Sequence, residues 1–275
     1  MRAILLGTGA PPPNPKRRGP STLVTLGGGS THFLVDAGSG VGVQMVQAGL
    51  RPYDWPPVFI THHHSDHTID LGHLLITRWI VGQNTPFEVY GPAGTRRQMD
   101  KLLDYLHWDI EVRRGHMIDR EPPAVRVTEI EEGKILDRDG MQISAFLVEH
   151  DPVKPAFGYR FDGDGRSLVI SGDTRPCENL MKWSHGVDVL IHECCEMART
   201  SWTPGCGWPT VEEKIRDLAS YHTQPDEIGR VAEGARPKRL VMTHLMPGSE
   251  PGELKGAAEK YFRGPVVVGD DLLEV

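Results

Sequence analysis

The stretch Thr61-His-His-His-Ser-Asp-His67 decides both the fold class and the chemistry of this chain. It directly follows a short apolar run and precedes a helix-like segment, so it lies at a strand-to-helix turn. Alternate side chains of an extended backbone point the same way, so His62 and His64 face one side. Asp66 and His67 enter the following turn and face the same space from the other direction. The segment therefore predicts two adjacent sets of metal ligands.

Four other apolar runs also end in residues that bind metals or transfer protons. These ends carry Glu149-His150, Ser171-Gly-Asp173, His192-Glu193 and Thr243-His244. In open sheets, functional sites form outside the carboxyl ends of the strands, so we expect these side chains to converge. Imidazole and carboxylate ligands suit zinc, with iron and manganese as alternatives. The sequence therefore predicts a metal centre built from several strand ends.

Short apolar runs separated by helical segments indicate sheets that are covered by helices. The expected strands are Ala3–Leu6, His32–Val35, Val58–Ile60, Leu168–Ile170, Val187–Ile191 and Leu240–Met242. Apolar spacing predicts a helix over Arg97–Leu106, and capping patterns predict helices after Thr210 and Thr223. Residues 110–148 alternate in polarity, beginning with Glu111-Val-Arg113, which favours one-sided strands there. We therefore expect an α/β or α+β fold.

Composition and charge limit the class of protein. The chain has 275 residues, 39% of them hydrophobic and 24% charged, and nothing marks a boundary, so we expect one domain over residues 1–275. No apolar stretch is long enough for a membrane span or a secretory signal, which predicts a cytoplasmic protein with no membrane partner. Four cysteines, two of them adjacent, do not suggest a disulfide framework. A net charge of -7 offers no global attraction to nucleic acid.

Taken together, these motifs resemble those of the metallo-β-lactamase superfamily, and more narrowly those of its ribonuclease Z and arylsulfatase-like branch. The resemblance covers the whole chain, and its motifs occur in the family's order. Besides residues 61–67 they are Leu5-Leu-Gly-Thr-Gly-Ala10, Arg18-Gly-Pro-Ser21, Val35-Asp-Ala-Gly38, Gly158-Tyr-Arg160, Ser171-Gly-Asp-Thr174 and His192-Glu193. The resemblance implies an α+β fold, a four-layer αββα sandwich, with two zinc ions bound between its sheets.

The resemblance also implies a role for each residue of the site. The first metal would take His62, His64 and His150, the second Asp66, His67 and His244, and Asp173 would bridge both. A hydroxide shared by the two ions is then the expected nucleophile of a hydrolysis. Asp66 is expected to act in catalysis as well as to bind the second metal. Asp36, which follows a strand, is expected to support the ligands from behind.

A second pair of residues indicates acid catalysis. In the ribonuclease Z-like branch, a strand-terminal His-Glu motif and a later His-Ser/Thr motif place a glutamate beside a histidine that binds no metal and faces the leaving group. The matching segments here are His192-Glu193 and His222-Thr223. His222 is thus expected to be the general acid and Glu193 to orient it. Cys194 and Cys195 depart from the relatives, which carry a small residue and then threonine.

The substrate expected from the sequence is a small ester. Ribonuclease Z inserts a long basic arm between the residues that correspond to His150 and Asp173, whereas only 23 positions separate them here. The missing arm and the negative net charge favour a phosphodiester or sulfate ester as substrate and no nucleic-acid partner. Trp202 and Trp208, in the segment 201–209, are expected to line the substrate pocket as part of a lid.

Three alternatives stay open at this point. A ribonuclease Z that processes tRNA 3′ ends would use the same metal ligands. A lactonase or β-lactamase-type hydrolase would use the same nucleophile. An iron-dependent persulfide dioxygenase shares the histidine motif and differs in its metal and in its need for oxygen. For assembly, a homodimer is considered because such relatives commonly form one.

Overall fold

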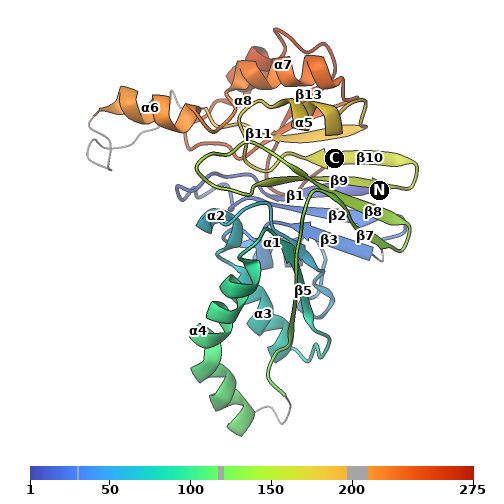
Figure 1. Ribbon diagram of the computed structural model, residues 1–275, viewed down its shortest axis with the longest axis vertical. Helices are drawn as coiled ribbons and strands as arrows, with labels where there is room; N and C mark the ends of the chain where they lie inside the picture. Colours follow the sequence, from blue (N-terminus) through green and yellow to red (C-terminus); the bar gives the residue numbers. More distant parts are fainter. Residues whose placement is uncertain (30, 117–120, 197–209) are drawn as a thin grey trace.

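The computed structural model describes residues 1–29, 31–116, 121–196 and 210–275 of the chain. Two seven-stranded sheets pack face to face, and helices cover both outer faces (Figure 1). These four layers confirm the predicted αββα sandwich of the α+β class. Within the described ranges, no helix is both long and apolar enough to cross a membrane.

The first sheet has the strand order β14-β1-β2-β3-β4-β5-β6. Strands β3 to β6 are parallel to one another, whereas β14, β1 and β2 pair antiparallel with their neighbours. The strands are β1 (Arg2–Gly7), β2 (Ser21–Leu26), β3 (Thr31–Val35), β4 (Val58–Phe59), β5 (Phe87–Gly91), β6 (Val125–Glu129) and β14 (Leu273–Glu274).

The second sheet has the strand order β13-β12-β11-β10-β9-β8-β7. Strands β10 to β13 are parallel to one another, and β7 to β10 pair antiparallel in sequence order. The strands are β7 (Gly133–Arg138), β8 (Met141–Leu147), β9 (Phe157–Gly163), β10 (Arg166–Ile170), β11 (Val189–Glu193), β12 (Leu240–Thr243) and β13 (Val266–Val268).

Each sheet carries its own helical layer (Figure 1). The layer on the first sheet contains α1 (Val41–Gln47), α3 (Leu71–Ile80) and α4 (Thr95–His116). The layer on the second sheet contains α5 (Glu178–Trp183), α7 (Pro225–Ala235) and α8 (Pro251–Ala258). The remaining elements are the short α2 (Ser65–Thr68), the 3-10 turn η1 (Pro52–Asp54) and α6 (Val211–Ala219), which lies beside the sandwich.

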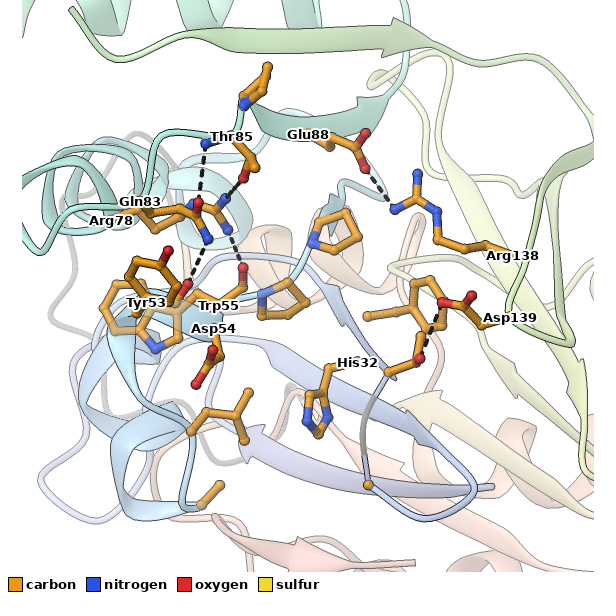
Figure 2. A pocket seen from close by; sticks show the side chains of 18 of the residues that line it. His32, Tyr53, Asp54, Trp55, Arg78, Gln83, Thr85, Glu88, Arg138 and Asp139 are labelled. Atoms are coloured by element: carbon orange, nitrogen blue, oxygen red, sulfur yellow. Dashed lines mark hydrogen bonds and ion pairs between the residues drawn. The ribbon is translucent and has the colours of Figure 1, made fainter. Parts of the chain in front are cut away.

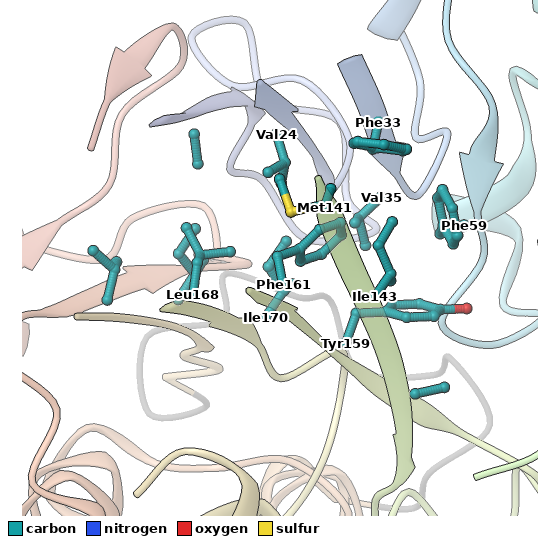
Figure 3. Packing of buried hydrophobic residues seen from close by; sticks show 14 of the residues in the cluster. Val24, Phe33, Val35, Phe59, Met141, Ile143, Tyr159, Phe161, Leu168 and Ile170 are labelled. Carbon is teal, nitrogen blue, oxygen red and sulfur yellow. The ribbon is translucent and has the colours of Figure 1, made fainter. Parts of the chain in front are cut away.

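The core between the two sheets consists of large apolar side chains from both (Figure 3). Phe59 of β4 meets the ring of Tyr159 of β9 edge-on at a centroid distance of 5.7 Å, and Phe33 lies 6.4 Å from Phe161. Each fully buried side chain of this size contributes roughly 1.5–3 kcal/mol through removal of apolar surface from water. This packing fixes the strand ends from which the loops of the metal centre start.

All six strands expected from the sequence are present, but one expectation about the central region is wrong. The helix predicted over Arg97–Leu106 continues to His116, so Glu111-Val-Arg113 is helical and not a strand. The polarity of only three residues cannot distinguish the period of a strand from that of a helix. Ion pairs between residues three and four apart stabilise the helix here. Arg113 pairs with Asp109 and Arg114 with Glu111.

Candidate metal centre

Three histidines point their ring nitrogens at one another at the edge where the parallel strands end. His62 Nε2 lies 3.0 Å from His64 Nδ1, which in turn lies 3.2 Å from His150 Nε2. His62 and His64 follow β4 of the first sheet, and His150 follows β8 of the second. Burial and the neighbouring imidazoles lower the pKa of His62 well below its usual value. Burial also lowers the pKa of His64 and of His150, which favours neutral rings whose lone pairs suit a shared cation.

A second group of donors lies beside the first. Asp66 and His67, in α2, face His244, which follows β12. The Nε2 atom of His67 lies 3.4 Å from Asp66 Oδ2, and the Nε2 atom of His244 lies 3.3 Å from the same oxygen. Burial lowers the pKa of His244, but the charge of Asp173 and the hydrogen bond with Asp66 outweigh this effect. The resulting pKa of His244 is about 9. The carboxylates thus favour a positive charge at this point.

Asp173, which follows β10, lies between the two groups. Its Oδ2 is 3.8 Å from His62 Nε2 and 3.3 Å from the Nε2 atoms of both His67 and His244. The side chain is only 3% exposed, and a buried carboxylate needs positive partners around it. Its position is the one expected of a ligand that contacts two cations.

The protein holds the Nδ1 atoms of His62, His67 and His150, which lie on the far side of these rings. Asp36 Oδ2 accepts from His67 Nδ1 at 2.7 Å, and Asp36 also accepts from the backbone N–H and the hydroxyl of Thr61. The Thr61 hydroxyl is 3.0 Å from His62 Nδ1, and the Tyr221 carbonyl accepts from His150 Nδ1 at 2.9 Å. Such contacts fix the tautomer and orientation of a metal-binding histidine. They leave the inward nitrogens free to bind.

The structure therefore brings together all seven predicted ligands and places Asp36 directly behind them. Because imidazoles and carboxylates converge from several strand ends of this fold, the site is a divalent metal centre. His64 and Asp66 are its partly exposed members, whereas His62, His67, His150, Asp173 and His244 are buried. A substrate would consequently approach from the side of His64 and Asp66. Which residue binds which ion stays a prediction.

Glu193 and His222 form a buried pair next to both groups. Glu193 Oε1 accepts from His222 Nδ1 at 2.9 Å and from the backbone N–H of Thr174 at 3.0 Å. The His222 ring lies 5.0 Å from that of His150 and 5.6 Å from that of His244. Burial lowers the pKa of His222, but the charge of Glu193 outweighs this effect, so the pKa is raised. The pair is therefore placed to keep an oriented, protonated imidazole beside the metal centre.

The two tryptophans expected to line the pocket, Trp202 and Trp208, lie outside the described residues, as does the expected lid 201–209. Conversely, Tyr159 belongs to the motif Gly158-Tyr-Arg160, but no role was predicted for its side chain. Its buried hydroxyl donates to the carbonyl oxygen of Ile60 at 2.6 Å, one residue before the histidine motif begins. Since Tyr159 comes from the opposite sheet, only the folded structure could reveal this contact.

Replacing Tyr159 by phenylalanine is expected to lower the free energy of unfolding by about 1–3 kcal/mol, because the buried Ile60 carbonyl loses its donor. Urea denaturation of the variant and the parent measures this difference. Tyr105→Phe is the matched control, since the Tyr105 side chain is 82% exposed and its change should leave stability unaltered. Equal stability of the Tyr159 and Tyr105 variants would contradict a supporting role for the buried hydroxyl.

Comparison with known proteins identifies the family to which the chain belongs. The model of the beta-lactamase superfamily domain matches residues 31–245. Ribonuclease Z of Mycobacterium avium is 37% identical over 282 aligned residues, which cover 100% of this chain and 98% of the relative. Ribonuclease Z of Mycolicibacterium paratuberculosis is 38% identical with the same coverage.

Two solved structures share the fold over its whole length. The metallo-beta-lactamase fold protein YhfI from Bacillus subtilis has a TM-score of 0.78 at 19% identity and covers 100% of this chain and 98% of its own. The short form of human tRNase Z has a TM-score of 0.72 at 24% identity, with the same coverage. At these identities the likeness shows the fold alone.

The relatives overturn the expected small-ester substrate and the expected absence of a nucleic-acid partner, because both are named as a ribonuclease. The missing arm does not distinguish this chain from these relatives. An alignment of 282 positions against 275 residues leaves room for an insertion of only a few residues in the relative. The negative net charge does not exclude RNA either, because contacts to phosphates depend on positively charged side chains near the site and not on the total charge.

Two independent findings establish the family. The domain model matches most of the chain, and relatives named ribonuclease Z match it from end to end at more than 30% identity. With the divalent metal centre described above, this makes the protein a metal-dependent hydrolase. The chain belongs to the metallo-β-lactamase superfamily and, within it, to the ribonuclease Z branch.

Proposed function

We propose that this protein is an endoribonuclease of the ribonuclease Z type that removes the 3′ trailer from precursor tRNA. The observation that carries the proposal is the Glu193–His222 pair, which lies beside both groups of metal ligands. Cleavage of an RNA phosphodiester expels a ribose oxygen, which is a poor leaving group unless it receives a proton. An oriented histidine at this position meets that need.

The assignment of ligands follows the geometry of the two groups. His62, His64 and His150 would hold one ion, Asp66, His67 and His244 the other, and Asp173 would contact both. We take both ions to be zinc, since imidazole and carboxylate ligands suit it. When bound, two such ions activate a water molecule as nucleophile and offset the negative charge of the phosphate.

The residues of the chain then have separate tasks. His222 gives its proton to the departing 3′ oxygen while the bond from water to phosphorus forms and the bond from phosphorus to that oxygen breaks. Glu193 keeps the imidazole in place through its 2.9 Å contact with Nδ1. Asp36 and Thr61 hold the histidines from behind, so that the ligands need no rearrangement when the substrate arrives.

Positively charged side chains near the metal centre support an RNA substrate despite the negative net charge. The loop after β1 is tied beside His244, because Gly9 forms a bridge with Leu245 and the N–H of Ala10 donates to the Leu245 carbonyl. The same loop carries Lys16 and Arg18, both exposed. The side chains of Lys16 and Arg18 can contact phosphates of an RNA strand that passes the metal centre. Such contacts make RNA binding sensitive to salt.

Purified protein is expected to cut a precursor tRNA with a 3′ trailer once, at the junction of tRNA and trailer, and to leave a mature tRNA of the same sequence intact. Chelation should abolish cleavage and added zinc should restore it, whereas higher salt should weaken it. Gel analysis of labelled RNA, combined with metal analysis of the protein, measures both effects. Cleavage that survives chelation, or turnover of small esters with intact precursor tRNA, would refute the proposal.

A further inference from the structure

A third group of potential ligands lies beside the second metal group. Glu193, Cys195, His222 and His244 each offer one donor atom, and these four atoms lie within 4.8 Å of one another. All four residues are buried, and Cys195 is only 1% exposed. The thiol of Cys195 thus lies among side chains that belong to the metal centre or to the Glu193–His222 pair.

Two atoms in the group lack the partners that buried polar atoms normally have. Glu193 Oε2 and His244 Nδ1 are buried and form no hydrogen bond in the structure. A buried carboxylate oxygen without a donor is unfavourable. A cation placed among the four residues would satisfy it. This is an observation independent of the cysteine itself, and it favours a ligand at this point.

The distances require only a small adjustment. In a tetrahedral zinc site the bonds to sulfur and nitrogen are about 2.3 and 2.0–2.1 Å long, which places the donors about 3.3–3.7 Å apart. The most separated donors of the group must therefore approach by about 1 Å at most. Cys195 packs with Ala10 and Met246 in a small cluster outside the three main cores, where such a shift disturbs little packing.

We propose that Cys195, Glu193, His222 and His244 form an alternative metal position that selects thiophilic ions. Thiolate ligands favour soft ions over the harder ions that carboxylates and imidazoles also accept, and binding displaces the thiol proton. An ion here engages His244, which also belongs to the group of Asp66 and His67. It also occupies both members of the Glu193–His222 pair, so the ion inhibits the enzyme.

Cadmium titration of the purified, metal-loaded protein tests the position directly. A thiolate-to-cadmium absorption band is expected in the ultraviolet for the parent protein and is expected to be absent in Cys195→Ala. Cys194→Ala is the matched control: this neighbour is equally buried but packs among apolar side chains of the second helical layer. It should keep the band. Cys177→Ala serves as a second control should the Cys194 variant fold poorly.

An equal band in Cys195→Ala, or no band in the parent protein, would overturn the proposal. Inhibition forms a separate arm, and only this arm rests on the proposed function. Cadmium should slow RNA cleavage at least tenfold in the parent and in Cys194→Ala, and much less in Cys195→Ala. If no preparation cleaves RNA, the proposed function fails while the absorption band still decides the metal position. Equal inhibition of all three proteins would show that the ion acts elsewhere.

Discussion

Asp173→Asn is expected to remove most of the bound metal and to reduce RNA cleavage by more than about 10³-fold, since single groups that stabilise charge in a reaction are already worth about 10²–10³. The asparagine keeps the size of the side chain but loses its charge. That charge lies 3.3 Å from both His67 and His244 and 3.8 Å from His62. Two cations close together need an anion between them. Metal analysis and single-turnover cleavage measure the two losses.

Asp188→Asn is the matched control for this experiment. Asp188 directly precedes β11 in the same sheet, and its carboxylate accepts from the backbone N–H of Ser167 and from Lys238. Its change should leave both metal content and cleavage near the parent values. If Asp173→Asn retains both ions, Asp173 does not bridge them, and the division of the seven residues into two sites is wrong.

His222→Ala is expected to retain both metal ions and to lose about 10²–10⁴-fold in the rate of RNA cleavage, the range typical of general acid catalysis. The loss should be much smaller for a nitrophenyl phosphodiester, because its leaving group departs without a proton. Glu193→Gln should show the same dependence on the leaving group in milder form, since Glu193 holds Nδ1 of His222. Pre-steady-state rates on both substrates and metal analysis measure these effects.

Two results would contradict this role for His222. Loss of metal from His222→Ala would make it a ligand, and equal slowing on both substrates would make it a residue of the binding site or of the fold. His185→Ala provides the comparison for a histidine change elsewhere, because His185 lies in the turn after α5, outside the metal centre. That variant should behave as the parent on both substrates.

The metal centre could be predicted from the sequence because its residues follow apolar runs. Strands that are buried on both faces leave a clear signal, and the carboxyl ends of parallel strands lie at one edge. His150, Asp173 and His244 are far apart in the chain but could be brought together by this rule. The capping pattern predicted at Thr210 is also confirmed. The Thr210 hydroxyl accepts from the backbone N–H of Glu213 at the start of α6.

Other features could not be predicted because they depend on contacts between distant segments. The hydrogen bond from Tyr159 to Ile60 joins the two sheets and leaves no local pattern. Apolar spacing predicts too early an end for α4, because its last turns are stabilised by ion pairs and lack an apolar stripe. The substrate prediction was wrong because relatives named ribonuclease Z align without a long insertion, and because the net charge does not describe the side chains near the site.

The ligands come from both sheets, and this has a thermodynamic consequence for the whole molecule. His62, His64, Asp66 and His67 belong to the first half of the sandwich, and His150, Asp173 and His244 to the second. Ions held by both sets act as a cross-link between the halves. A ligand that binds only the folded chain adds about 4.1 kcal/mol of stability when its free concentration is 1,000 times its dissociation constant. The supply of metal in the cell would then set the lifetime of the folded protein as well as its activity.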